Sequence, residues 1–457
     1  MRRLKLATTT ALLALVTASG LQAGAPHLVF AHYMVCFESY GESLDGYKRE
    51  IQQAQAAGID GFALNVGAWD DSQAYYKSRV ALIYNAAEQL GTGFKLFFSV
   101  DFENASNTVS MVESFANRTN SFHYQGKLVL SSYGHNDVPA AGWTGVDWTN
   151  AVIGKLVKDG IPVFFIPHFF PSPVQELPGY ADAQSILKKY GNLLDGLFLF
   201  VAAGLPGQLA TCNSNYTAAV HAANKVSMAS VSPHYWGCVQ STLGRRYFES
   251  DGAEGLAQQW NSIIATQPDW VELVTWNDWN ESTYLCPIDD PGVYFTGVAS
   301  PRRYTHSGYL EFCKHFISWF KNGNEPALNH DTLFCFYRTH PRSAAASDTN
   351  DLPVTWFIGD VQDNVYATVL LTSAADLEIQ SGKLSSTNSF GPGLHSARVP
   401  FGPGPQSLNL RRNGTNVVSI EGVNILSNIV AYDFFPYSAC NTNQPQPPGN
   451  FRILGAP

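Results

Sequence analysis

Two carboxylic acids in this sequence occupy positions where acid–base chemistry is expected. Asp101 ends the run Lys95-Leu-Phe-Phe-Ser-Val, and a carboxyl group that follows a buried strand loses its water unless it has partners. Glu281 lies in Trp276-Asn-Asp-Trp-Asn-Glu-Ser-Thr-Tyr284, where carboxyl, amide and aromatic side chains are concentrated. Hydrolysis of a glycosidic bond requires one neutral and one ionised carboxyl group. The pair therefore predicts acid–base catalysis by Asp101 and Glu281.

Polar and aromatic residues at the ends of other apolar runs are candidates for binding a substrate. Aromatic rings offer flat apolar faces to sugar rings, while amide and carboxyl groups hydrogen-bond to hydroxyls. The predicted substrate-binding residues are His32, Asn65, Trp69, His168, His234, Tyr235, Trp236, Trp276, Asn277, Asp278 and Tyr284, with Tyr33, Tyr133 and His135 nearby. Structural roles stay open, because tryptophans also fill cores and an aspartate such as Asp101 or Asp278 also caps helices or loops.

Motifs for other chemistries are absent from the sequence. His32, His168 and His234 follow three different apolar runs, but no HxH or HExxH spacing accompanies them, so no metal site is predicted. Neither a GxSxG elbow nor a GxGxxG or GxxxxGK[ST] loop occurs, which disfavours a serine nucleophile and a nucleotide cofactor. We expect an enzyme without a cofactor and keep a non-catalytic glucan-binding wall protein as an alternative.

Eight short apolar runs, separated by amphipathic segments, must position these side chains. The runs cover residues 28–35, 59–65, 94–100, 127–132, 162–167, 195–202, 225–232 and 270–276. Helices are expected at Leu44–Ala57, at Gln73–Leu90 and near Thr305–Lys321, with Gly58 and Gly91 as the stops of the first two. Eight such units predict an α/β protein with a (β/α)8 TIM barrel, whose active site lies at the carboxyl ends of the strands.

The composition changes after the last expected helix, from amphipathic segments to Gly- and Pro-rich, alternating apolar and polar residues. Short strands at 356–358, 365–371, 375–379 and 417–421 predict a C-terminal antiparallel β-sandwich domain. The expected organisation is a signal peptide over residues 1–25, a catalytic barrel over 26–340, and an accessory β-sandwich over 341–457 that ends in a loose tail.

The N-terminal segment and the charge indicate a secreted protein. Arg2, Arg3 and Lys5 precede an apolar run and then small residues, which is the pattern of a secretory signal. Removing these three residues changes the net charge from −9 to −12, which disfavours nucleic acid and anionic membranes as partners. No later apolar run is long enough to span a membrane. We expect an extracellular or cell-wall-associated monomer whose partner is a neutral polysaccharide or oligosaccharide.

Cysteines and glycosylation sequons are consistent with that location. Seven cysteines without CxxC spacing favour disulfides over a metal site, and Cys212 with Cys238 is the first candidate pair. The glycosylation sequons begin at Asn104, Asn117, Asn215, Asn280 and Asn413. A glycan on Asn280 would block substrate, because this residue precedes Glu281.

Several segments together resemble one known family. They are Ala31-His-Tyr-Met, Gly58-Ile-Asp-Gly-Phe-Ala-Leu-Asn65, Lys95-Leu-Phe-Phe-Ser-Val-Asp101, Val231-Ser-Pro-His-Tyr-Trp236, Gln267-Pro-Asp and Val274-Thr-Trp-Asn-Asp-Trp-Asn-Glu-Ser-Thr-Tyr284. Their order and residues resemble the fungal α-1,3-glucanases, or mutanases, of glycoside hydrolase family 71. The resemblance spans nearly the whole expected barrel and continues less distinctly into the β domain.

This resemblance implies endo-type hydrolysis of α-1,3-glucan, a fungal cell-wall polymer, with inversion. Asp101 and Glu281 match the family's catalytic positions, with Glu281 as general acid and Asp101 as general base. Asp278 is the nearest alternative, since it shares the loop of Glu281 and could instead orient Glu281 or bind sugar hydroxyls. Unlike many relatives, the sequence has no long Ser/Thr-rich linker and no carbohydrate-binding module after residue 440, so wall remodelling or soluble oligosaccharides are equally compatible. Another α-glucan or an α-mannoside remains an alternative substrate.

Overall fold

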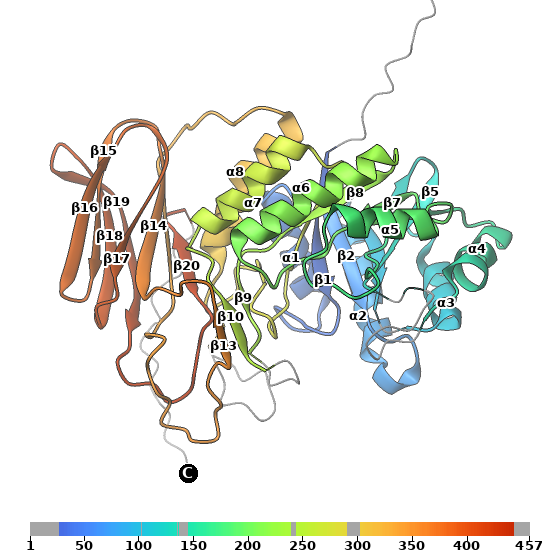
Figure 1. Ribbon diagram of the computed structural model, residues 1–457, viewed down its shortest axis with the longest axis horizontal. Coiled ribbons are helices and arrows are strands. Elements are labelled where there is room, and N and C mark those ends of the chain that lie inside the picture. The colour runs from blue at the N-terminus through green and yellow to red at the C-terminus, as the bar shows by residue number, and fades with distance from the viewer. Residues whose placement is uncertain are drawn as a thin grey trace, which may run out of the picture.

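The computed structural model describes residues 27–101, 103–134, 136, 145–238, 244–289 and 302–442 of the 457-residue chain. A curled sheet covered by helices lies on one side of the molecule and two antiparallel sheets lie on the other (Figure 1). The predicted signal peptide (1–25), His135 and the tail beyond residue 442 lie outside the described residues.

The curled sheet contains a strand at each of the eight predicted apolar runs. Neighbouring parallel strands follow the order β6 (Val163–Phe165), β5 (Lys127–Ser132), β3 (Lys95–Val100), β2 (Gly61–Val66), β1 (Leu28–Met34), β11 (Trp270–Leu273), β8 (Val226–Val231) and β7 (Gly196–Phe198). The two-residue β4 (His123–Tyr124) pairs antiparallel with β5. The eight predicted strands are therefore confirmed.

Helices connect these strands. They are α1 (Leu44–Ala56), α2 (Tyr75–Leu90), α3 (Ala105–Phe115), α4 (Gly154–Lys158), α5 (Tyr180–Tyr190), α6 (Pro206–Ala222), α7 (Glu254–Thr266) and α8 (Ser307–Asn322), with short 3₁₀ and π segments at Asp71–Gln73 and Trp148–Ile153. The Ser43 hydroxyl begins α1 by accepting a hydrogen bond from the Gly46 amide. Gly91 ends α2 in the left-handed conformation, with φ of 61°. The three predicted helices are confirmed to within a few residues.

The concave side of the sheet is filled by side chains that alternate along the strands. One buried cluster takes a residue from each parallel strand: Phe30, Ala63, Phe97, Val129, Phe164, Phe198, Met228 and Trp270. Backbone hydrogen bonds of 2.9 Å, from Asp195 to Phe165 and from Phe198 to Pro167, connect β7 with β6 at the two ends of the parallel order. Because the side-chain period is two, the next inward residue of each strand lies closer to its carboxyl end.

Two antiparallel sheets follow the helical part of the chain. One has the order β17 (Gly393–Pro400), β14 (Asn364–Leu371), β12 (Thr332–Tyr337) and β20 (Tyr437–Cys440); the other has β16 (Leu384–Phe390), β15 (Ala375–Ser381), β18 (Gly404–Arg412) and β19 (Thr415–Ile425). Both contribute to one buried cluster, for example through Val369 and Leu408. Since β12 belongs to this part, the architecture changes before residue 340, the boundary expected from composition.

A small third sheet joins the two parts of the chain. Its order is β13 (Trp356–Ile358), β10 (Arg246–Phe248) and β9 (Tyr235–Trp236), with β13 parallel to β10 (Figure 1). The prediction that residues 356–358 form a sandwich strand is therefore wrong. The pairing partner of β13 comes from the segment after β8, which no local sequence pattern identifies.

The predicted disulfide between Cys212 and Cys238 is also wrong. Both are free thiols, as are Cys36, Cys286, Cys313 and Cys335. Cys212 is buried in α6, where burial raises the pKa of its thiol to about 11. The Cys238 thiol donates to the Trp279 carbonyl instead, at 3.4 Å.

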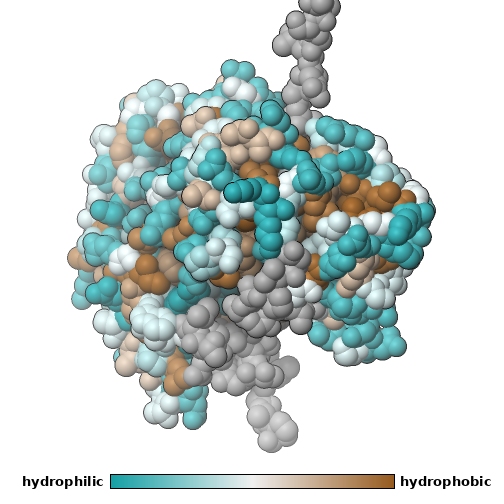
Figure 2. All heavy atoms as spheres, turned by 45° about the vertical axis from the view of Figure 1, so that its right-hand side comes forward, coloured by the Kyte–Doolittle hydropathy of each residue, from teal (hydrophilic) through white to brown (hydrophobic). Residues whose placement is uncertain are grey.

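Hydrophilic residues predominate on the face shown in Figure 2, with smaller hydrophobic patches between them. The exposed large apolar residues include Val157, Val174, Leu352 and Trp356. Within the described part of the chain, no helix has the length and apolar character required to cross a membrane. Trp356 stands out because most tryptophans of this chain are buried.

Candidate active site

Three carboxyl groups interact at the carboxyl ends of the curled sheet. Asp101 directly follows β3, while Asp278 and Glu281 lie in the loop after β11. The charge of Asp101 contributes to raising the pKa of Asp278, after burial, and the charge of Asp278 contributes to raising that of Glu281, again after burial. Burial and then the charges of Glu281 and Asp101 raise the pKa of Tyr133, which follows β5. The fold therefore brings the two predicted catalytic residues into one electrostatic cluster.

The carboxyl group of Asp101 is buried, and only one of its two oxygens accepts a hydrogen bond from the described residues. Its backbone amide donates to the Val66 carbonyl at 2.9 Å, and its Oδ2 accepts from the Asn65 amide at 3.3 Å. Its Oδ1 is buried without a hydrogen-bond partner among the described residues. Burial raises the pKa of Asp101 to about 7, although Asn65 and the charge of His32 oppose the shift. One carboxyl oxygen therefore has unused capacity to accept a hydrogen bond.

Backbone hydrogen bonds fix the loop that carries the other two carboxyl groups. The Thr275 amide donates to the Thr283 carbonyl at 2.9 Å, which folds the loop back on itself. The Trp236 amide donates to the Glu281 carbonyl at 2.9 Å, which ties the loop to β9. Asp278 Oδ1 accepts from the Glu281 amide at 3.1 Å. The backbone of Glu281 is therefore held from two sides.

The surroundings of Asp278 and Glu281 raise the pKa values of the two carboxyl groups by different amounts. Burial and then the Asp278 charge raise the pKa of Glu281 to about 8, although the Tyr235 hydroxyl donates to Glu281 Oε1 at 3.1 Å. Burial raises the pKa of Asp278 to about 6, and backbone amides at Glu281 and Asn280 oppose this shift because they stabilise the charged form. Glu281 therefore keeps its proton to a higher pH than Asp278 does.

Arg246 on β10 extends the site along the small sheet. Its guanidinium lies 5.7 Å from the centre of the Tyr235 ring and pairs with Glu176 at 3.0 Å. Its positive charge lowers the pKa of Glu281, against the larger effect of burial. Sequence patterns do not single out Arg246, because β10 lies in a long segment between β8 and α7.

His32 forms a buried pair with a residue that the sequence analysis missed. His32 Nδ1 lies 2.6 Å from Glu272 Oε1, and the side chains are 1% and 0% exposed. His32 projects inward from β1, as Phe30 does, and Glu272 projects inward from β11, as Trp270 does. Glu272 could have been found from the sequence, because it is a charged residue at an inward-facing position of an otherwise apolar strand. The pair orients the His32 ring beside Asp101.

Replacing Glu272 by Ala is expected to lower the free energy of unfolding by about 3–5 kcal/mol, because it leaves a buried imidazole without its partner. Urea denaturation followed by circular dichroism measures the change. Asp71→Ala is the matched control, since the Lys77–Asp71 pair is exposed and its loss should change stability by less than about 0.5 kcal/mol. Equal effects of the two substitutions would contradict a stabilising role for the His32–Glu272 pair.

The other two predicted histidines lie near the cluster and are neutral. The His168 ring stacks on Tyr133 with 5.5 Å between centroids, and its Nδ1 accepts from the Phe200 amide at 3.1 Å. Burial lowers the pKa of His168 to about 4. His234 Nδ1 lies 3.2 Å from the Ser282 hydroxyl, and burial lowers its pKa as well. Among the described residues, no cluster of three or more His, Cys, Asp or Glu side chains is arranged to hold a metal ion.

Several residues predicted to bind substrate lie in the interior instead. The fully buried ones are Trp236, Trp276, Asn277 and Tyr284. Trp276 Nε1 donates to Glu50 Oε2 at 2.7 Å, and the Tyr284 hydroxyl donates to the Tyr304 carbonyl at 2.6 Å. Trp236 packs on Phe434 and Phe435, from the chain's C-terminal part. These contacts give Trp236, Trp276 and Tyr284 partners within the protein, and their direct contact with a substrate stays a prediction.

Asn277 and Trp69 also have structural partners. Asn277 accepts from the Met34 amide at 2.8 Å and donates to the Phe37 carbonyl at 2.9 Å, which holds the loop after β1. Trp69 is buried in the hydrophobic core, and its ring packs on Phe98 with 6.4 Å between centroids. Direct contact of Trp69 and Asn277 with a substrate likewise stays a prediction. Of the predicted residues, Asn65 donates to Asp101, Tyr235 donates to Glu281, and Asp278 accepts from the Glu281 amide.

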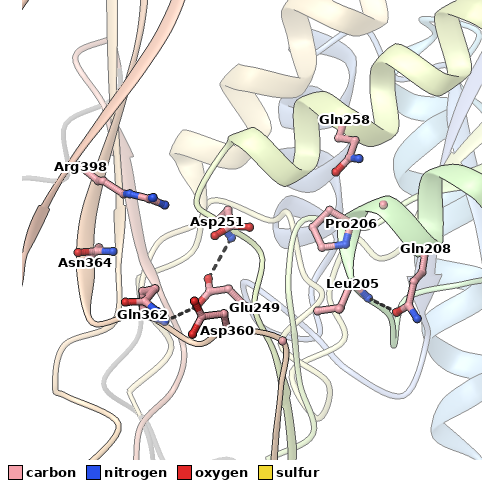
Figure 3. A pocket seen from close by; sticks show the side chains of 12 residues that line it. Leu205, Pro206, Gln208, Glu249, Asp251, Gln258, Asp360, Gln362, Asn364 and Arg398 are labelled. Carbon is pink, nitrogen blue, oxygen red and sulfur yellow. Dashed lines mark hydrogen bonds between the residues drawn. The ribbon is translucent and has the colours of Figure 1, made fainter.

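A separate cavity of about 860 Å³ lies where the N-terminus of α6 faces the segment after β13. Figure 3 shows Glu249, Gln362 and Arg398 among the polar side chains around it. Glu249 accepts hydrogen bonds from the Asp251 amide at 2.9 Å and the Gln362 amide at 3.2 Å. The lining residues include neither an aromatic ring nor a member of the carboxyl cluster, so this cavity does not compete with it as the active site.

Carboxyl groups gathered at the carboxyl edge of a curled parallel sheet are an arrangement that a glycoside hydrolase can use. The chain belongs to glycosyl hydrolase family 71, whose sequence profile matches residues 25–446. The resemblance that the sequence segments indicated is confirmed by this match.

Similar proteins cover nearly the whole chain. Glucan endo-1,3-alpha-glucosidase agn1 of Schizosaccharomyces pombe is 29% identical over 433 residues, which cover 91% of this chain and 94% of that protein. A mutanase of Penicillium rubens is 27% identical over 431 residues, covering 90% and 87%. The ascus wall endo-1,3-alpha-glucanase of S. pombe is 28% identical over 435 residues, covering 89% and 95%.

Solved structures are more distant. The GH99 endo-alpha-mannosidase of Bacteroides thetaiotaomicron has a TM-score of 0.46 and 13% identity, and the match covers 64% of this chain and 97% of that one. A glycoside hydrolase family 5 protein of Bacteroides vulgatus has a TM-score of 0.41 and 10% identity, covering 82% and 86%.

Proposed function

We propose that this protein is a secreted, endo-acting hydrolase of α-1,3-glucan that inverts the anomeric configuration. The observation that carries the proposal is the carboxyl cluster, in which the pKa of Glu281 is raised to about 8 while that of Asp278 is raised only to about 6. The assignment of the α-1,3 linkage rests on the family and on the names of similar proteins, which are endo-1,3-α-glucanases and mutanases.

In the proposed mechanism Glu281 is the general acid. Its carboxyl proton passes to the glycosidic oxygen as the bond to the anomeric carbon breaks. The hydrogen bond from Tyr235 occupies Oε1 and thereby orients the other carboxyl oxygen. Water attacks the opposite face of the sugar, and an ionised aspartate takes the proton of that water.

Asp101 is the proposed base, because one of its buried oxygens lacks a hydrogen-bond partner among the described residues and keeps its capacity to accept a proton or a hydrogen bond. Asp278 is the alternative base. Its pKa of about 6 is below the value of about 7 for Asp101, so it ionises first. However, its Oδ1 already accepts from the Glu281 amide. We assign Asp278 to holding this loop and to keeping Glu281 protonated.

The proposed architecture is a closed (β/α)8 barrel followed by a β-sandwich, with the division between α8 and β12. The backbone hydrogen bonds between β7 and β6 and the inward cluster drawn from all eight parallel strands support closure. The cluster shared by the two antiparallel sheets supports the sandwich. The signal-like N-terminus and the ascus-wall relative support a secreted or wall-associated protein, which we expect to be a monomer without a cofactor.

The test of this function is incubation of the purified protein with α-1,3-glucan, with reducing ends and the anomeric form of fresh product followed by NMR. Release of β-anomers is expected. Release of α-anomers would instead indicate a covalent intermediate with Asp101 as nucleophile. Equal cleavage of α-1,4-glucan or α-mannan in parallel reactions would remove the linkage assignment, and binding without any cleavage would favour the wall-binding alternative.

The pH profile of kcat/KM is expected to be bell-shaped. Activity should rise as the aspartates ionise, with pKa values of about 6 and about 7, and should fall as Glu281 loses its proton near a pKa of about 8. Initial rates on a soluble α-1,3-linked oligosaccharide between pH about 4 and about 10 measure both limbs. A flat profile across this range would contradict the assigned acid–base pair.

A further inference from the structure

We propose that Trp356 on β13 is a sugar-stacking residue of a distal subsite, which binds a polysaccharide chain that extends from the carboxyl cluster. This inference rests on the proposed function and adds a residue that determines preference for long chains. Trp356 lies far along the sequence from the catalytic loops, and only the pairing of β13 with β10 brings it to them.

The register of the small sheet places Trp356 on the same face as Tyr235. Trp356 is paired with Arg246, and Tyr235 with Phe248, while Arg246 and Phe248 are two residues apart on β10. Directly paired residues point to the same face, as do residues i and i+2. Ring centroids of Tyr235 and Phe248 are 5.4 Å apart, which agrees with a shared face. Tyr235 is the residue that hydrogen-bonds to Glu281.

The opposite face of this sheet is covered by protein. Trp236, Tyr247 and Phe357 all pack on Phe434, with ring centroids 5.5–5.7 Å apart. The exposed fraction of Trp236 is 0%, whereas that of Trp356 is 51%. The indole of Trp356 is therefore open to solvent on the face that leads to the carboxyl cluster.

The backbone around Trp356 supports its ring. Gly244 has φ of +73°, and a Cβ atom there would lie only 3.0 Å from Trp356 Cζ3. The indole edge therefore lies against this backbone. The Thr355 amide donates to the Arg245 carbonyl at 2.7 Å, which anchors the start of β13. A ring held in this way loses little conformational entropy when a sugar stacks on it.

The spacing suits a long substrate. β13 lies two strands from β9, so Trp356 is roughly 10 Å from Tyr235 across the sheet, at about 4.8 Å per strand. A single sugar bound at Glu281 does not reach this ring, whereas a chain does. Arg246 lies on the strand between the two positions and, with its ion-pair partner Glu176, offers polar groups to sugar hydroxyls. The occupant that fits this series of rings and polar groups is one continuous glucan chain.

The test measures binding by calorimetry in a Glu281→Gln background, with α-1,3-linked oligosaccharides of increasing length. Adding Trp356→Ala is expected to raise the Kd of the longest oligosaccharides about tenfold, the effect of losing one stacked aromatic ring, and to leave that of the shortest unchanged. Trp356→Tyr should restore most of the affinity. Leu384→Ala is the control, because it removes another exposed apolar side chain on β16, outside this sheet.

A Kd that Trp356→Ala leaves unchanged at every length would overturn the inference, and so would an equal loss for short and long oligosaccharides. Failure of the proposed function looks different, because the wild type then leaves α-1,3-glucan intact. In that case the same length series is made from whichever polysaccharide the wild type cleaves. If Trp356→Ala again weakens the binding of long oligosaccharides only, the role of Trp356 is supported although the α-1,3 linkage is wrong. If it does not, both the role of Trp356 and the linkage assignment are overturned.

Discussion

Glu281→Gln is expected to lower kcat for glucan hydrolysis by roughly 10²- to 10⁴-fold, because an amide cannot give a proton to the departing oxygen. Affinity for oligosaccharide should change little, since Gln keeps the shape and can still accept the Tyr235 hydrogen bond. Reducing-end assays measure the rate. Glu421→Gln on the exposed surface of β19 is the matched control and should keep full activity. Retained activity in Glu281→Gln would contradict its role as the acid.

The same variant also has a predictable effect on stability. Because the folded-state pKa of Glu281 is raised to about 8, its contribution to stability is greatest below the unfolded pKa and is lost as pH rises through about 8. Gln has no charge to bury, so the melting temperature of Glu281→Gln should exceed that of wild type at alkaline pH and approach it in acid. A variant that melts lower at every pH would instead have lost structure, and its low activity would not identify the acid.

Asp101→Asn and Asp278→Asn are expected to change the kinetics in different ways. Asp101→Asn should lower kcat by roughly 10²- to 10⁴-fold, through loss of the base, and leave the alkaline limb of the pH profile in place. Asp278→Asn removes the charge that raises the pKa of Glu281, so its alkaline limb should move to lower pH. Initial rates across pH for both variants measure the two effects.

Azide supplies the discriminating control, because it attacks the anomeric carbon without needing a base. Added azide should restore turnover to Asp101→Asn and yield a glycosyl azide of inverted configuration. Asp278→Asn should gain little, since its defect lies in the protonation of Glu281 and in the loop. Rescue of Asp278→Asn alone would transfer the role of base from Asp101 to Asp278.

The positions of the strands could be predicted because they depend on local pattern. Each parallel strand is buried on both sides and is therefore a short, nearly continuous apolar run bounded by helical segments. Asp101 and Glu281 could be identified for the same reason, because both are exceptions to a local pattern. Asp101 is a carboxyl group directly after an apolar run, and Glu281 is a carboxyl group among aromatic residues. The resemblance of the motifs to a known family was not needed for this step, although it supplied the family.

The roles of the aromatic residues could not be predicted in the same way. Tyr235 and Trp236 are neighbours in β9, yet the first contacts Glu281 and the second packs on Phe434 from the far end of the chain. Alternation places them on opposite faces, but which face is covered depends on a segment about two hundred residues later. Trp276 was assigned to substrate for its type, whereas its indole donates to Glu50 in α1.

The sequence by itself determined the parallel strands, their helices, the family and the two leading carboxyl groups, because apolar periodicity and motif residues are local properties. Only the tertiary structure decided which side chains share the site and how strongly the pKa of Glu281 is raised. It also decided that Trp356 lies on the same face of the small sheet as Tyr235. Burial, charge proximity and strand pairing decide these features, and each depends on residues distant in the chain. The partnership of His32 with Glu272 and the free thiols of Cys212 and Cys238 have the same origin.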